Sequence, residues 1–112
     1  MEPRLASSVL VTALLRRAEA EGGFGTVLAR GDATAGAIAM VLVERGENPR
    51  FLERVLQPDG RYAWQETKLS MESDEELQAL IDRRWRFDPD LWVLELDIVS
   101  AERFAAEMNS IG

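Results

Sequence analysis

Hydrophobic positions change their spacing several times along the chain, and each change marks the boundary of an expected element. From residue 5 to residue 21 the apolar side chains recur at helical spacing: Leu10, Val11, Leu14, Leu15 and Ala18. Ser7 or Ser8 is a suitable cap for the start of this helix, and Gly22-Gly23 is a stop signal. The pattern therefore predicts an N-terminal amphipathic helix.

Two strands are expected next. Residues 24–30 have the composition of a short strand, and Gly31-Asp32 after them is a turn signal. Residues 35–44 (AGAIAMVLVE) are nearly all apolar, which is typical of a strand buried on both faces. Residues 46–49 (GENP) are expected to end that strand.

Residues 49–57 fit two structures. Pro49 suits the first position of a helix, with Asn48 as its cap. However, residues 57–61 (QPDGR) form a strong tight-turn sequence, and aromatic and polar residues alternate in residues 62–67 after it. A β-hairpin explains both halves and the turn together, so we favour a strand, and the helix stays open.

The second half of the chain predicts a helix, a strand and a short C-terminal helix. Residues 73–86 begin with a capping box, Ser73 and Glu76, and carry acids in the first turn and arginines in the last. Asp88-Pro89-Asp90 ends this helix. Residues 91–99 (LWVLELDIV) then indicate a strand, and Ser100 can cap the final helix.

The order of these elements predicts an α+β fold in a single domain, residues 1–112. Consecutive strands joined by short turns imply antiparallel pairing. We therefore expect a roughly five-stranded, mainly antiparallel sheet on which the N-terminal helix, the helix near 73–86 and the short C-terminal helix pack.

Composition excludes several kinds of chemistry. The chain has no cysteine and no histidine, so thiolate sites, catalytic triads and histidine-bound metals are impossible within it. The formal net charge of −7 argues against a dedicated nucleic-acid binder and against docking on an anionic membrane. No cofactor or metal motif is present, and no segment is typical of a signal peptide, so we expect a soluble cytoplasmic protein.

Four stretches together resemble a bacterial family. They are LLRRAE (residues 14–19), ARGDATAGAI (29–38), PDGRYAW (58–64) and RRWRFDPDLWV (83–93). In matching order they are similar to the domain-of-unknown-function family 1491, which is mainly alphaproteobacterial. The resemblance implies a stand-alone bacterial cytosolic protein, but it supplies no activity, substrate or catalytic residue.

The strongest candidate contact site is an arginine and aspartate cluster with aromatic neighbours. Its members are Arg83, Arg84, Arg86, Asp88 and Asp90, framed by Trp85, Phe87 and Trp92. Guanidinium groups near a helix end can bind a carboxylate or phosphate. The structural interpretation is simpler: the arginines complement the helix dipole, the aspartates form the turn, and the aromatic residues lie in the core.

Three further groups are weaker candidates. Arg30-Gly31-Asp32, with Thr34 and Gly36, can bring a backbone close to a ligand, but a turn between strands is the simpler interpretation. Carboxylates on expected strands can bind a cation, yet solvated strand residues explain them as well: Glu44, Glu53, Glu66, Glu95 and Asp97. Trp64, Tyr62 and Trp92 are of the types that anchor protein interfaces.

We favour a small non-enzymatic interaction or accessory module as the function. The alternative is a small-ligand binder, for an anion such as phosphate or a carboxylate, or an enzyme that uses the arginine and aspartate cluster. A protein partner or a homo-oligomer is compatible with either interpretation, and the sequence leaves the oligomeric state open.

Overall fold

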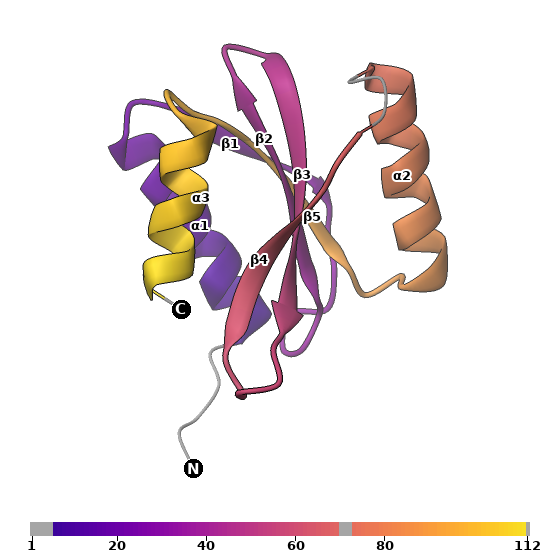
Figure 1. Ribbon diagram of the computed structural model, residues 1–112. Helices are drawn as coiled ribbons and strands as arrows, with labels where there is room; N and C mark the ends of the chain where they lie inside the picture. Colours follow the sequence, from indigo (N-terminus) through magenta and orange to yellow (C-terminus); the bar gives the residue numbers. More distant parts are fainter. Residues whose placement is uncertain (1–5, 70–72, 112) are drawn as a thin grey trace.

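In the computed structural model, which describes residues 6–69 and 73–111, one five-stranded sheet lies between helices on both faces (Figure 1). The elements are α1 (Ser7–Ala20), β1 (Phe24–Ala29), β2 (Ile38–Glu44), β3 (Glu47–Leu56), β4 (Tyr62–Thr67), α2 (Asp74–Phe87), β5 (Trp92–Asp97) and α3 (Ala101–Ile111). The expected α+β class is thus confirmed, with all three expected helices; residue 5 of the predicted first helix lies outside the described residues.

The strand order is β1-β5-β2-β3-β4. β5 and β2 are parallel, and the other three neighbouring pairs are antiparallel, so the sheet is mainly antiparallel as predicted. The expected pairing of consecutive strands holds for β2, β3 and β4 but is wrong for β1 and β2, because β5 lies between them. β5 lies inside the sheet and not at its edge because Val93 and Leu94, on its opposite faces, are both fully buried.

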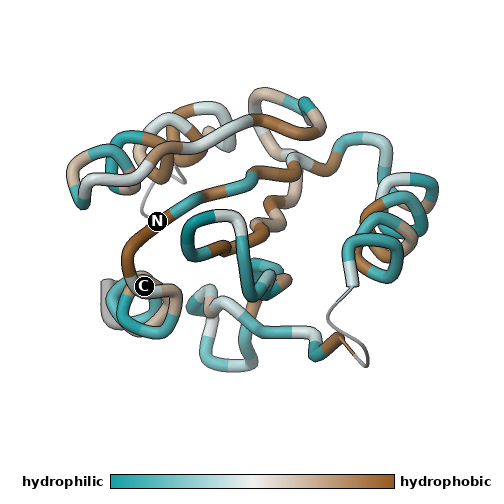
Figure 2. The backbone as a smooth tube through the Cα atoms, turned by 90° about the horizontal axis from the view of Figure 1, so that it is seen from above, coloured by the Kyte–Doolittle hydropathy of each residue, from teal (hydrophilic) through white to brown (hydrophobic). Residues whose placement is uncertain are grey.

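Two cores sandwich the sheet. α1 and α3 cover one face, where Met40, Leu94 and Phe104 are fully buried, and α2 covers the other, where Val41 and Phe51 are fully buried. Figure 2 shows α2 on the opposite side of the sheet from α1 and α3. β2 contributes to both cores, which confirms that it is a strand buried on both faces.

Local signals were correct at two helix starts and wrong at the third. The hydroxyl of Ser73 accepts a hydrogen bond from the Glu76 amide (3.1 Å), and the Ser100 hydroxyl accepts one from the Arg103 amide (3.2 Å). Neither Ser7 nor Ser8 caps α1. The cap residue is Ala6, and the Ser7 hydroxyl instead donates to the Gly36 carbonyl (2.6 Å), which ties the helix to the loop before β2.

The ambiguous segment is the strand β3, and it pairs with β4 as the hairpin interpretation predicts. The break before it is shorter than expected. Arg45 and Gly46 both have positive φ, 54° and 77°, as the two central residues of a tight hairpin turn require. Because these two residues suffice to reverse the chain, β3 already begins at Glu47, and Pro49 lies within the strand.

Candidate functional site

The expected cluster lies on α2, whose residues divide among three faces because positions three and four apart share a side of a helix. Leu77, Leu80, Ile81 and Arg84 face the sheet. The Arg84 guanidinium reaches across to β3 and pairs with the Glu53 carboxylate (Nη2–Oε1, 3.0 Å). Arg84 therefore has a structural partner already.

A second face of α2 points to solvent and carries Arg83, Arg86 and Phe87. Phe87 is 86% exposed, so the expectation that it belongs to the core is wrong. It is the last residue of α2, seven residues after the buried Leu80 and four after Arg83, so it lies between the sheet-facing side and the solvent face, at the end of the helix that the sheet does not cover. Within the described ranges, neither Arg83 nor Arg86 forms an ion pair.

The third face of α2 turns toward β1 and forms a groove with it. This groove has a volume of about 430 Å³, and its lining residues are Leu28, Ala29, Arg30, Gln78, Ile81, Asp82 and Trp85. Trp85 is 48% exposed, which corrects its expected core position. The side chain stands at the edge of the sheet, where no further strand covers it in the described residues.

The aspartates of the cluster hold the turn between α2 and β5. The Asp88 carboxylate accepts from the Asp90 amide (3.2 Å), and the Asp90 carbonyl accepts from the Asp32 amide (3.0 Å). Trp92 is only 3% exposed, and its indole N–H donates to the Asp32 carbonyl (2.7 Å). Trp64 is half-buried and packs against the core beneath α1 and α3. The structure thus does not gather these residues into one pocket with the arginines.

The loop at residues 30–36 is a closely packed turn. The Asp32 carboxylate accepts from the backbone amides of Thr34 and Ala35, at 3.2 and 2.8 Å. A Cβ atom at Gly31 or Gly36 would overlap the Asp90 carbonyl oxygen. These glycines therefore allow two pieces of backbone to approach each other, which is the structural interpretation of this motif.

Four of the five candidate acids on the strands are engaged in structural contacts: Glu44, Glu53, Glu66 and Asp97. The Glu44 carboxylate accepts from the Ala101 amide at the start of α3 (2.7 Å), and the Asp97 carboxylate accepts from the Arg45 amide (2.9 Å). Glu66 pairs with Arg50 at 2.7 Å, and this hydrogen bond raises the pKa of Arg50. Among the residues that the structure describes, no group of three or more acids is arranged to hold a metal ion.

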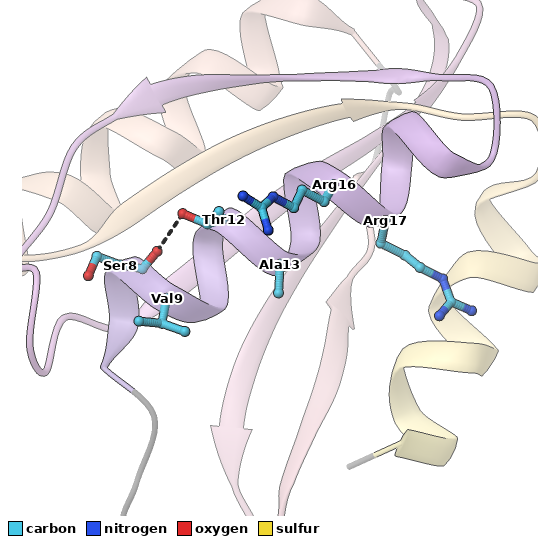
Figure 3. Close-up of a pocket in the computed structure, with 6 residues that line it drawn as sticks. All are labelled: Ser8, Val9, Thr12, Ala13, Arg16 and Arg17. Carbon is cyan, nitrogen blue, oxygen red and sulfur yellow. Dashed lines mark hydrogen bonds between the residues drawn. The ribbon is translucent and has the colours of Figure 1, made fainter.

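A larger cavity, about 610 Å³, lies on the outer surface of α1 (Figure 3). All its lining residues come from this single helix: Ser8, Val9, Thr12, Ala13, Arg16 and Arg17. The Thr12 hydroxyl is bonded within the helix to the Ser8 carbonyl (3.0 Å), and Arg17 pairs with Glu107 of α3 (2.6 Å). This cavity is therefore a shallow helix surface and not a cleft between elements.

The sequence interpretation missed the exposed apolar surface of β1. Phe24, Val27 and Leu28 are 59%, 40% and 46% exposed, although they belong to a strand of the sheet. The available signal was the composition of residues 24–29 (FGTVLA), a strand without charge. Composition alone does not show which strand ends the sheet, so the exposed edge emerges only from the strand order.

No helix in the described part of the chain is long and apolar enough to cross a membrane. No curated protein is detectably similar to this sequence. The chain does resemble solved structures. A DUF1491 family protein from Caulobacter crescentus, known from a crystal structure, shares 36% identity over 90% of this chain and 94% of its own, with a TM-score of 0.80.

A second solved structure, the solution structure of Atu0922 from A. tumefaciens, shares 31% identity with a TM-score of 0.76. The match covers 92% of this chain and 93% of Atu0922. The model of the family described as "Protein of unknown function (DUF1491)" matches residues 5–106. This span includes all five strands, α1, α2 and the first half of α3. The chain belongs to the DUF1491 family.

Proposed function

We propose that this protein is a small, non-enzymatic cytoplasmic interaction module that binds a partner protein through the solvent face of α2. The single observation that carries the proposal is Phe87, which is 86% exposed at the end of a helix. Arginine and aromatic side chains are the residue types that contribute most to protein interfaces. Arg83 lies between Phe87 and Arg86 around the helix, four residues from the first and three from the second, so the three residues form one contact surface.

The chemistry of this surface defines the partner. Phe87 requires an apolar pocket, because leaving a large aromatic ring in water forgoes about 1.5–3 kcal/mol of burial energy. Each guanidinium presents several donors in a planar fork and suits carboxylate or carbonyl acceptors at the rim of that pocket. We therefore infer a folded partner with an apolar pocket surrounded by acceptor groups.

The alternative function, anion binding by the arginine and aspartate cluster, has less support. Arg84 is committed to Glu53, and the aspartate contacts described above lie within the chain's own turns. The groove next to the cluster is lined by Trp85 but by none of the five charged cluster residues. A phosphate titration followed by NMR distinguishes the two functions, because anion binding would shift the Arg83 and Arg86 signals at millimolar phosphate.

The test of the proposal is site-specific photo-crosslinking in the native host. A photoreactive amino acid replaces Phe87 in one variant and, in a control, the exposed Arg61 in the turn between β3 and β4. We expect one host protein to be captured at position 87 and not at position 61. Untagged wild-type protein should compete for it, whereas the Phe87→Ala variant should compete at least about tenfold less well. Equal capture at both positions would refute the proposed contact surface.

A further inference from the structure

β1 forms an open edge of the sheet. The strand order ends at β1, and its outer side pairs with no other strand in the described residues. Its six residues include neither a charged side chain nor proline, two of the features with which proteins block strand addition. A third such feature, an irregularity, is confined to the end of the strand between Val27 and Ala29. An uncharged edge with exposed hydrophobic residues is therefore available to pair with another strand.

An irregularity in β1 determines which of its side chains share a face. The pairing with β5 shifts between Val27 and Ala29, so Leu28 is an extra residue in the strand. Phe24, Thr26 and Ala29 pair with Asp97, Glu95 and Val93, all on the face that α2 covers. The groove between β1 and α2 lies on this same face.

We propose that β1 pairs antiparallel with β1 of a second copy of this chain, about a two-fold axis at Thr26. In this register Thr26 faces Thr26 of the second copy, and Phe24 lies opposite its Ala29. When Leu28 is left out as the extra residue, five positions of each β1 remain. Each of them then pairs with a position of the other copy whose side chain lies on the same face of the sheet. The two sheets then continue as one ten-stranded sheet with both α2 helices on the same side.

The self-pairing fills the groove. Phe24 is 59% exposed and belongs to the face on which the groove opens. Opposite Ala29, its ring enters the second copy's groove between Leu28 and Trp85, and symmetry repeats the contact. Phe24 of one copy thus covers the half-exposed Leu28 and Trp85 of the other. Because the chain itself supplies the residue that fills the groove, a second copy is favoured over an unrelated strand.

Charge also favours this occupant. A net charge of −7 opposes self-association in general, but β1 itself is uncharged. The two ends of β1 differ in sign: Glu19 is exposed near the end of α1, just before β1, and Arg30 is exposed directly after it. Antiparallel pairing places each Arg30 beside the acidic end of the other copy.

The opposite face of the sheet leaves room for the second copy. Leu15 of α1 packs over Gly25, which has no side chain to hold the helix away from β1. Ser8 and Thr12 lie on the same side of α1 as Leu15, at helical spacings of four and three residues. Their small side chains, seen in Figure 3, allow the α1 helices of two copies to approach each other.

The first test is the oligomeric state of the full chain, measured by sedimentation equilibrium. We expect the wild type to sediment at twice the monomer mass of 12.5 kDa. Phe24→Asp should raise the dimer dissociation constant by at least about thirtyfold without lowering the thermal midpoint of the monomer. The control Phe87→Asp changes an even more exposed phenylalanine and should leave the dimer intact.

The second test fixes the register and does not depend on the Phe24 variant. Because the chain has no cysteine, Thr26→Cys introduces a single thiol at the proposed axis. Oxidation should join two copies of this variant covalently, whereas Gln65→Cys, at an exposed position on the other edge strand, should form no covalent dimer.

A wild type that remains monomeric up to millimolar concentration would overturn the proposal. So would a dimer that survives Phe24→Asp and fails to cross-link through Thr26→Cys. The inference uses the β1 side of α2 and not its solvent face. Failure of the partner contact at Phe87 therefore leaves the dimer standing, and the reverse also holds.

Discussion

The two edges of the sheet are built differently. At β4, the backbone amide of Trp64 donates to the side chain of Asn109 on α3 (2.8 Å), and Glu66 forms an ion pair with Arg50. At β1, the strand carries no charge, and Phe24, Val27 and Leu28 are exposed. A covered, charged edge resists strand addition, and an uncovered apolar edge invites it.

The difference between the edges follows from the position of the C-terminal helix, α3. α3 follows directly after β5, yet it packs over β2 and β4 and leaves β1 to α1. The helix thus protects the edge that is far from β5 and not the one beside it. If both edges were equally exposed in solution, the difference between β1 and β4 would have no consequence. The substitutions below test whether the two edges and the helices that cover them behave differently.

The largest effect is expected at Trp92, the first residue of β5, which is the strand that pairs with β1. The side chain is 3% exposed, and its indole N–H is bonded to the Asp32 carbonyl. Trp92→Ala should cost about 3–5 kcal/mol in the free energy of unfolding, because it leaves a cavity in the core and removes the indole hydrogen bond. Urea denaturation measures this, and a loss below 1 kcal/mol would remove Trp92 from the core.

A smaller loss is expected from Gly25→Val in β1 itself. A Cβ atom at this position would lie 2.5 Å from Leu15 Cδ2 and 2.8 Å from Leu96 Cδ2, so both packed leucines must shift. The cost should be about 1–3 kcal/mol. Gln65→Val, at an exposed position on the other edge strand, β4, is the control and should stay within about 0.5 kcal/mol of wild type. Equal unfolding midpoints for the two variants would show that α1 does not rest on β1.

At the opposite edge, Asn109→Ala should remove the cover of β4. The lost hydrogen bond to the Trp64 amide should cost about 0.5–1.5 kcal/mol, and hydrogen exchange at that amide should become faster. Asn109→Asp retains an acceptor oxygen and should restore protection. If Trp64 exchanges equally fast in all three proteins, Asn109 does not cover the edge.

Elements with a local cause could be predicted from the sequence. Ser73 caps α2 because its hydroxyl reaches an amide three residues away, a contact that depends on no other part of the fold. Likewise, the turn before Tyr62 specifies the β3–β4 hairpin, and the apolar run at residues 35–44 specifies a buried strand. Each of these signals lies within a few residues of the structure that it produces.

Features that depend on distant contacts could not be predicted. The place of β5 between β1 and β2 follows from packing on both faces, and several apolar stretches satisfy that requirement equally well on composition. Similarly, the helical pattern of α2 marks Phe87 as apolar but does not say that the sheet ends before reaching it. The engagement of Arg84 with Glu53 requires knowing that β3 runs beneath α2.

The smallest effect is expected from pH, at the contact that holds α3 against α1. The hydrogen bond from Arg17 lowers the pKa of Glu107 and raises that of Arg17. Because the folded pKa of this carboxyl lies below its unfolded value, its stabilising contribution is complete above the unfolded pKa. That contribution is lost as the pH falls through the folded pKa. Acid should therefore loosen α3, which also carries Asn109 over β4.

An NMR titration of the Glu107 carboxyl measures this shift directly. Arg17→Gln should move the midpoint up toward the ordinary glutamate value, because the hydrogen bond from Arg17 is the largest cause of the lowered pKa. Arg103→Gln is the matched control: its guanidinium is 3.8 Å from the same carboxylate and should matter less. A midpoint that moves equally in both variants would mean that charge near Glu107, and not the bond between α1 and α3, sets its pKa.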